Sequence, residues 1–180
     1  MPTPELRIRR GVVEDAPAAS RLHAATWRTS YRGLVPDALL DGLADDRWEA
    51  GWRRAFDGLD PARVVHVAER DGALVGIAGG GRARPGAPPE HVGEVYILYV
   101  HPAHQGQGIG TALLRATAAA LVERGLVPIV IWTLFTNPVS RGFYAARGGT
   151  VIGEKHESFD GHPLHEVAYG WRDPAPLLGP

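Results

Sequence analysis

The stretch that decides the fold is residues 100–111, which read VHPAHQGQGIGT. It follows an apolar run and precedes the alanine- and leucine-rich segment 108–124, so we expect a strand, a tight turn and a helix. Three glycines, Gly106, Gly108 and Gly110, permit positive φ angles and a close approach of the backbone to a ligand. The first N–H groups of the helix would point out of this turn with the positive end of the helix dipole. That arrangement suits an anion such as a diphosphate.

Two familiar phosphate-binding loops do not match this turn. No lysine follows the glycines as it does in a nucleoside-triphosphatase loop. A dinucleotide-binding fingerprint needs a third glycine where Thr111 stands and an acidic residue about twenty positions later, where this chain is apolar. A nucleotide-binding oxidoreductase is therefore disfavoured. Taken alone, the turn is also compatible with a purely structural corner between a strand and a helix.

Length and composition restrict the class of protein. With 180 residues, the chain suffices for one well-packed domain. Its net charge of −1 offers no basic excess for a nucleic-acid backbone, and the lack of cysteine excludes disulfides and thiolate metal sites. No apolar run reaches the length of a membrane span, and the first ten residues lack the apolar centre of a signal peptide. We expect a cytoplasmic protein that binds neither membranes nor nucleic acid.

The rest of the chain predicts an α/β fold with one mixed sheet, in a domain at 1–173 followed by a loose tail at 174–180. The expected strands are 6–9, 64–70 and 73–80 around an Asp71-Gly72 turn, 92–100, 128–134, and a final hairpin of 150–155 and 166–171 joined by a polar loop. The expected helices are 16–29, which Asp15 would cap, 36–43, 108–124, which Gly125 would end, and 138–147, which Asn137 would cap. A further helix is expected to start at Asp45 or Asp46 and to carry Trp48, Trp52 and Phe56 on one face.

A family resemblance adds to this pattern. Gln105-x-x-Gly108-x-Gly110 resembles the Q/R-x-x-G-x-G/A signature of the GNAT superfamily of N-acetyltransferases, and residues 98–102, LYVHP, resemble the strand before that signature. Further features follow in the family's order, namely Asn137, Phe143-Tyr144, a small-residue turn at 148–149 and the closing hairpin. One departure is Gly149, where the family usually carries an aromatic residue.

The resemblance implies a single-domain GNAT-like fold, with a mixed, mostly antiparallel sheet of about six or seven strands, splayed at its centre and flanked by about four or five helices. It also implies that acetyl-CoA is the acyl donor and that its pantetheine arm lies between the strands 92–100 and 128–134. The diphosphate would lie on the amides of 105–111. The cofactor-binding residues implied in this way are Leu98, Tyr99, Val100, Gln105, Gly106, Gln107, Gly108, Ile109, Gly110, Thr111, Asn137 and Tyr144.

Amide formation needs two proton movements, and two residues are candidates for them. Tyr144 lies two helical turns after Asn137, and we expect it to stabilise the departing thiolate. Full proton transfer from a phenol to a thiolate is uphill by roughly 2 kcal/mol, so we expect a hydrogen bond instead. Glu94 is the candidate base, acting through water, and strand alternation places it on one face with Tyr96 and Leu98. A solvated charge at the strand end is the alternative for Glu94.

The resulting prediction is an N-acetyltransferase that moves an acetyl group from acetyl-CoA to a primary amine of a small-molecule acceptor by direct attack in a ternary complex. A catalytically silent acyl-CoA-binding sensor is the alternative, and similar proteins make a homodimer an expectation. We expect no metal, because the closely spaced histidines, namely His101 with His104 and His162 with His165 near His156, fall in predicted loops or strand ends and not on one helix with a nearby carboxylate. The acceptor pocket is expected from 24–43, 84–90 and 156–165. Arg82 and Arg84 are compatible with an acidic acceptor or with simple solvated charge.

Overall fold

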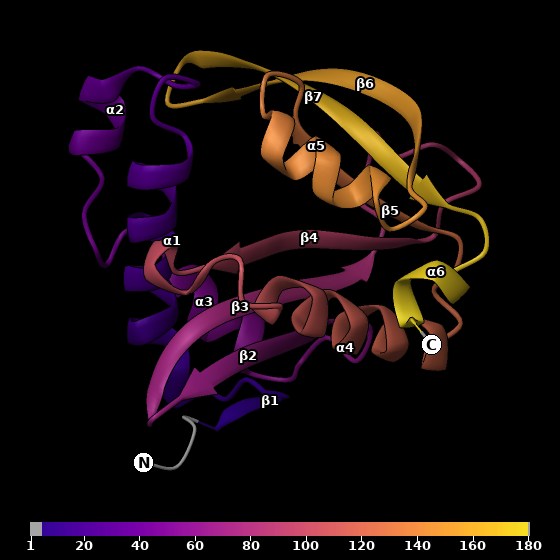
Figure 1. Ribbon diagram of the computed structural model, residues 1–180, viewed down its shortest axis with the longest axis horizontal. Helices are drawn as coiled ribbons and strands as arrows, with labels where there is room; N and C mark the ends of the chain where they lie inside the picture. The colour runs from indigo at the N-terminus through magenta and orange to yellow at the C-terminus, as the bar shows by residue number, and fades with distance from the viewer. Residues whose placement is uncertain (1–4, 180) are drawn as a thin grey trace.

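The computed structural model describes residues 5–179, which form one seven-stranded sheet with helices on both faces (Figure 1). The strands are β1 (Leu6–Arg10), β2 (Val64–Arg70), β3 (Ala73–Arg82), β4 (Gly93–Val100), β5 (Ile129–Leu134), β6 (Thr150–Phe159) and β7 (His162–Trp171). Their order in the sheet is β1-β2-β3-β4-β5-β7-β6. Only β4 and β5 pair in parallel, so the expected mixed, mostly antiparallel sheet is confirmed.

The helices of the described residues occupy the expected places, with one addition. They are α1 (Ala16–Ser30), α2 (Asp37–Asp41), α3 (Glu49–Phe56), α4 (Ile109–Glu123), α5 (Pro138–Ala145) and α6 (Ala175–Leu178). The addition is α6, where Leu177 is buried against the core cluster that α4 also joins. The prediction of a loose tail is therefore wrong for this part of it, because an apolar side chain there finds a packing site; residue 180 lies outside the described residues.

The central splay of the sheet follows from how β4 and β5 pair. Their register covers only Gly93–Val95 against Ile129–Ile131, after which the strands diverge. The second half of β4 therefore keeps its backbone groups on the β5 side free of strand partners. No other pair of neighbouring strands in the described sheet separates in this way, so the splay marks the place where a ligand can take up a strand's hydrogen bonds.

A β-bulge in β4 changes which side chains share a face. Val95 pairs with Gly80 and Ile97 with Gly79, so Tyr96 is an extra residue on β4. As a result, Val95 and Leu98 pack in the clusters that α4 covers, whereas Ile97 packs in the cluster under α1 and α3. The prediction that Glu94 shares a face with Leu98 is wrong, because simple alternation does not anticipate the bulge.

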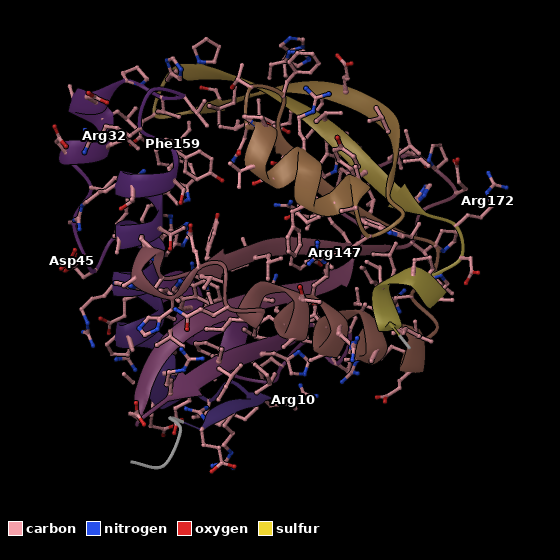
Figure 2. All side chains as sticks on the ribbon, in the orientation of Figure 1. Arg10, Arg32, Asp45, Arg147, Phe159 and Arg172 are labelled. Atoms are coloured by element: carbon pink, nitrogen blue, oxygen red, sulfur yellow. The ribbon has the colours of Figure 1, made fainter. Side chains whose placement is uncertain are left out.

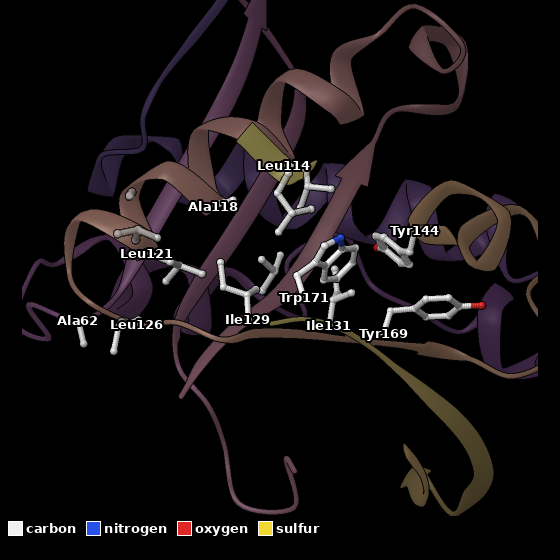
Figure 3. Packing of buried hydrophobic residues seen from close by; sticks show 14 of the residues in the cluster. Ala62, Leu114, Ala118, Leu121, Leu126, Ile129, Ile131, Tyr144, Tyr169 and Trp171 are labelled. Atoms are coloured by element: carbon white, nitrogen blue, oxygen red, sulfur yellow. The ribbon is translucent and has the colours of Figure 1, made fainter. Parts of the chain in front are cut away.

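Two layers of apolar side chains hold the helices to the sheet. On one face, α4 contributes Leu113, Leu114 and Leu121, each at most 1% exposed, and Figure 3 shows two of them above Ile129 on β5. Each such leucine contributes roughly 1.5–3 kcal/mol by leaving water. On the other face, α1 and α3 pack Leu22, Trp52 and other side chains on β2 and β3. None of the helices in residues 5–179 combines the length and apolarity that a membrane crossing needs.

Two Asp-Gly turns make the hairpins of this sheet. The predicted Asp71-Gly72 turn joins β2 to β3, with φ angles of 51° and 77°. The same pair, Asp160-Gly161, joins β6 to β7 with φ angles of 48° and 79°. The prediction of two short strands, 150–155 and 166–171, joined by a polar loop is therefore wrong, because both strands continue to this tight turn. Its polar sequence reflects the outer position of β6, whose side chains are largely exposed, and not a lack of strand structure.

Helix starts in the first third of the chain differ from the expectation. Asp15 makes no side-chain cap for α1. Its carboxylate instead accepts a hydrogen bond of 2.9 Å from the N–H of Val12 and pairs with Arg9 at 2.7 Å. The third helix begins at Glu49, later than expected, but it still presents Trp52 and Phe56 to the core. These shifts leave the packing face of each helix unchanged.

Candidate active site

A cavity with a volume of about 590 Å3 lies where β4 and β5 separate. Its walls come from five segments, which are β4, the glycine turn with the start of α4, β5, α5 and the end of α1. Figure 1 shows α5 above the β4 ribbon and α4 below it. Segments far apart in the sequence therefore meet around one cavity, which has the size of a site for a substrate or cofactor.

The glycine turn supplies one end of the cavity. Gly106 and Gly108 have φ angles of 73° and 80°, a region where an L side chain is strained. Gly108 stands directly before α4, so the N–H groups of the first turn, on Ile109, Gly110 and Thr111, have no carbonyl partners within the helix. These residues line the cavity, which gives it an anion-binding end with the positive pole of the α4 dipole.

Eleven of the twelve residues predicted to bind the cofactor line this cavity. The exception is Gln107, whose side chain contacts Arg70 and the carbonyl of Ala103 instead. Gln105 lines the cavity, and its Nε2 donates a hydrogen bond of 3.1 Å to the carbonyl of Val100, which ties the turn to the end of β4. The structure thus brings the predicted turn, the free half of β4 and α5 together.

Helix α5 presents two polar side chains to the cavity. The Oδ1 of Asn137 accepts a hydrogen bond of 3.1 Å from the N–H of Ser140, so this residue caps the helix as predicted. Tyr144 is 6% exposed, and its hydroxyl has no hydrogen-bond partner among residues 5–179. Burial, together with the neighbouring Tyr99, raises the pKa of Tyr144 well above its usual value. The phenol is therefore protonated at neutral pH and can only donate to an anion in the cavity.

Hydroxyl groups also gather where α1 meets β4. The indole Nε1 of Trp27 donates to the hydroxyl of Tyr99 at 3.1 Å. Burial raises the pKa of Tyr99 to about 12, and it also raises the pKa of Tyr31 well above its usual value. Both tyrosines line the cavity with Thr26 and Thr29 of α1. This end is therefore polar and uncharged, in contrast to the anion-binding end at the glycine turn.

Arg147 is a cavity residue that sequence reasoning missed. Its guanidinium carbon lies 3.5 Å from the centroid of the Phe143 ring, Nη1 donates to the carbonyl of Phe143 at 2.8 Å, and Nη2 contacts Thr111. Figure 2 shows Arg147 between α4 and α5, beside the glycine turn. Its position in the last turn of the predicted helix was readable, but its proximity to Thr111 depends on how α5 packs. The residue adds a positive charge to the anion-binding end.

Glu94 does not reach the cavity. It is 1% exposed, and it is absent from the cavity wall. One carboxylate oxygen accepts 2.8 Å from the backbone N–H of Arg84, and the other accepts 2.9 Å from Nε of the same arginine and also contacts Nη2. The structure therefore separates Glu94 from Tyr144, and the carboxylate holds Arg84 in place.

Near the α1 side of the cavity, an aromatic contact and an ion pair join segments that are distant in the sequence. The Phe159 ring lies 4.4 Å from the ring of Trp27, centroid to centroid, and the neighbouring Asp160 pairs with Arg47 at 2.7 Å. We call these four residues the clasp. Figure 2 shows Phe159 beside α1, on the side of the molecule away from Arg147. The clasp joins the tip of the β6–β7 hairpin to α1 and to the segment between α2 and α3.

Comparison with known proteins decides the family. The model of the acetyltransferase (GNAT) family matches residues 24–149, well over half of the chain. The chain belongs to this family. As a GNAT family member it is an acyltransferase, as the resemblance implied. The match ends at Gly149 and includes the glycine turn, Asn137 and Tyr144.

This GNAT chain is similar to two relatives and one solved structure in particular. It is 30% identical over 92% of its length, and 92% of the relative's, to an uncharacterised N-acetyltransferase, YuaI, of Bacillus subtilis (strain 168). It is 40% identical over 64% of its length to the mycothiol acetyltransferase of Cellulomonas flavigena, but it spans only 40% of that protein. The PaiA N-acetyltransferase of Thermoplasma acidophilum, solved in complex with coenzyme A, superposes with a TM-score of 0.71 at 17% identity, covering 93% of this chain and 99% of the other. That structure shares the fold.

Proposed function

We propose that this chain transfers an acetyl group from acetyl-CoA to a primary amine of a small-molecule acceptor, by direct attack within a ternary complex. The observation that carries the proposal is one cavity that joins the free amides before Thr111 to the unpaired phenol of Tyr144. The coenzyme A bound in the structurally similar PaiA protein supports the donor. The name of the mycothiol acetyltransferases supports a small-molecule acceptor.

Acetyl-CoA would bind through backbone groups along its length. Its diphosphate would accept hydrogen bonds from the amides at the start of α4, with Arg147 adding charge. Its pantetheine amides would pair with the free edge of β4 near Leu98 and Val100, in place of the missing partner strand. Asn137 keeps its amide nitrogen available to the same arm, because only its oxygen is used by the helix cap. The thioester then lies near Tyr144.

Tyr144 would stabilise the thiolate that leaves when the amine attacks. Because its pKa is raised, the phenol donates a hydrogen bond and does not transfer its proton fully. Backbone N–H groups beyond the Tyr96 bulge can hold the oxyanion of the tetrahedral intermediate, a role that preorganised donors fill well. Both contributions act on charge that appears only during the reaction, which is the condition for lowering a barrier.

For the general base, we keep the candidate that the sequence predicts, which is Glu94. Glu94 would have to accept the amine proton through water, while both of its oxygens are held by Arg84. Replacing it by glutamine tests this role through the pH dependence of kcat/KM. A base at Glu94 predicts that the acidic limb of the profile disappears in Glu94→Gln; an unchanged limb at a lower plateau indicates that the carboxylate only positions Arg84.

Binding and turnover together test the proposal. Calorimetry with acetyl-CoA should show saturable binding, and a panel of primary amines should release free CoA. A thiol reagent reports that CoA without background, since the chain has no cysteine. Binding without release from any amine would favour the silent acyl-CoA sensor. No binding of acetyl-CoA at all would overturn the transferase.

A further inference from the structure

A second, smaller cavity lies on the face of the sheet that α1 and α3 cover. Its volume is about 220 Å3, below the roughly 300–1,000 Å3 of a site for a drug-sized molecule, so it suits one small group. Its walls include Trp48, Trp52, Tyr96 and His23, whose ring stacks on Trp48 at 3.7 Å. Tyr96 and Ile97 line this cavity and the main one, so the two cavities adjoin at the bulge of β4.

Two guanidinium groups flank the tyrosine ring in this cavity. The Cζ atoms of Arg84 and Arg63 lie 4.9 and 5.7 Å from the ring centroid of Tyr96. Glu94 neutralises Arg84, whereas Arg63 forms no ion pair within the described part of the chain. No aspartate or glutamate lines the cavity. Its wall therefore carries a positive charge without a matching negative one.

Unpaired hydrogen-bond donors lie in the same wall. Trp52 Nε1 and Arg63 Nε can only donate, and both are buried without a partner, as is His23 Nδ1. Trp52 and His23 are 7% and 8% exposed. Burial, with a smaller effect of Arg47, lowers the pKa of His23 to about 3, so this ring adds no charge of its own. Buried donors without partners are costly, and these three belong to residues of the cavity wall, where a small shift of a side chain toward a bound acceptor oxygen would give them a partner.

The aromatic walls alone would also suit an ammonium group, which is attracted to the faces of indole and phenol rings. The charge distribution decides against it. A cation in this space would lie near the guanidinium group of Arg63, which has no lining carboxylate to offset the repulsion. A carboxylate meets the opposite situation, because a guanidinium matches its geometry and charge.

We propose that the second cavity binds a carboxylate of the acceptor, so the acceptors are amino acids or similar amines with an apolar group beside the acid. The inference rests on the proposed acetyl transfer and names its substrate class. The carboxylate would contact Arg63, and the apolar group would pack on Trp48 and Trp52. Because the cavities adjoin at Tyr96, an amine on the same small molecule faces the splay of β4 and β5, where the thioester is expected.

Matched pairs of ligands test this class. Phenylalanine should be acetylated with a KM at least tenfold below that of phenylalaninamide. The amine of an amide is less basic, so N-acetylphenylalanine and its carboxamide, which have no basic amine, are compared as product inhibitors and by calorimetry. Tighter binding of the carboxylate supports the proposal, and equal or tighter binding of the carboxamide overturns it. The calorimetric comparison needs no turnover, so it speaks about the cavity even when no acceptor is acetylated.

Arg63→Gln tests the residue itself, with Arg82→Gln as a control for an exposed arginine that lines neither cavity. Arg63→Gln should raise the KM for phenylalanine about tenfold and leave the KM values for acetyl-CoA and phenylalaninamide unchanged. Arg63→Lys should recover part of the loss, and Arg82→Gln should change nothing. Equal losses for the acid and the amide in Arg63→Gln would assign the residue a structural role and overturn the proposal.

Discussion

The two halves of the proposed active site are built in different ways. The half beside α4 consists of consecutive backbone, namely the turn 105–111 and the free edge of β4. The half beside α1 and α3 is assembled from side chains that are distant in sequence, such as His23, Trp48 and Arg63. A local backbone motif is visible in a sequence, whereas an assembly of side chains depends on packing. The donor half was therefore predictable and the acceptor half was not.

The largest expected effect breaks the donor half. In Gly108→Val, a β-branched residue replaces a glycine with a φ of 80°, so the turn must change conformation and its N–H groups no longer point at the diphosphate. Loss of two hydrogen bonds to the diphosphate, at about 1.5 kcal/mol each, predicts a Kd for acetyl-CoA raised about 100-fold in calorimetry. Gly86→Val is the matched control, because Gly86 has a φ of 96° with free space around it in a loop away from the cavity. Equal losses in the two variants would contradict the proposed role of the turn.

The next effect lies at the junction of the two halves. Tyr144→Phe removes the hydrogen bond to the leaving thiolate and should lower kcat about 30-fold, with the Kd of acetyl-CoA nearly unchanged. Tyr169→Phe is the control, since Tyr169 is equally buried and lies 5.9 Å from Tyr144, ring to ring, but does not line the cavity. Stopped-flow measurement of CoA release gives kcat for both variants. An unchanged kcat in Tyr144→Phe would remove its proposed role.

A third prediction concerns the stability of the acceptor half. The folded pKa of His23 is about 3, below its unfolded value of 6.5, so the unfolded state binds more protons between these values. Stability should fall as the pH drops below 6.5, by about 2 kcal/mol from this residue between pH 7 and pH 5. His23→Phe keeps the stacking on Trp48 and should remove this part of the slope in urea titrations. A smaller slope remains from His66, whose pKa burial also lowers. An identical slope in the variant would refute the assignment.

The smallest effect sharpens the boundary of the donor half. Arg147→Gln removes one charge beside the glycine turn and should raise the Kd of acetyl-CoA about fivefold, less at high salt because the contact is partly solvated. Arg141, on α5 itself, packs on Phe135 away from the cavity, so Arg141→Gln should have no effect on that Kd. A matching change in both variants would mean that Arg147 only stabilises α5.

The sequence predicted what depends on neighbours along the chain. The strand–turn–helix at Gly108, the cap at Asn137 and the Asp71-Gly72 hairpin each follow from local chemistry, and all three are present. The polar residues of the β6–β7 hairpin predict a loop, so the sequence analysis makes this hairpin too short, although Asp160-Gly161 carries the same turn signal as Asp71-Gly72.

Other features depended on contacts between distant segments. The Tyr96 bulge arises from the register with β3, so alternation along β4 alone misplaced Leu98 relative to Glu94. The burial of Glu94 under Arg84 likewise requires the loop after β3 to fold back. Neither event leaves a periodic signal. The roles of charged side chains are therefore the part of this site that only the three-dimensional structure reveals.

The clasp has a consequence for how substrates arrive. Because Phe159 contacts Trp27 and Asp160 pairs with Arg47, the tip of the β6–β7 hairpin is held to α1 and to the segment before α3, so side chains link the two halves of the sheet beyond the splay. Under the proposed function, the donor arm would enter between α4 and α5, and the acceptor would approach from the face that α1 and α3 cover. The two substrates would then meet end to end, each with its own exit.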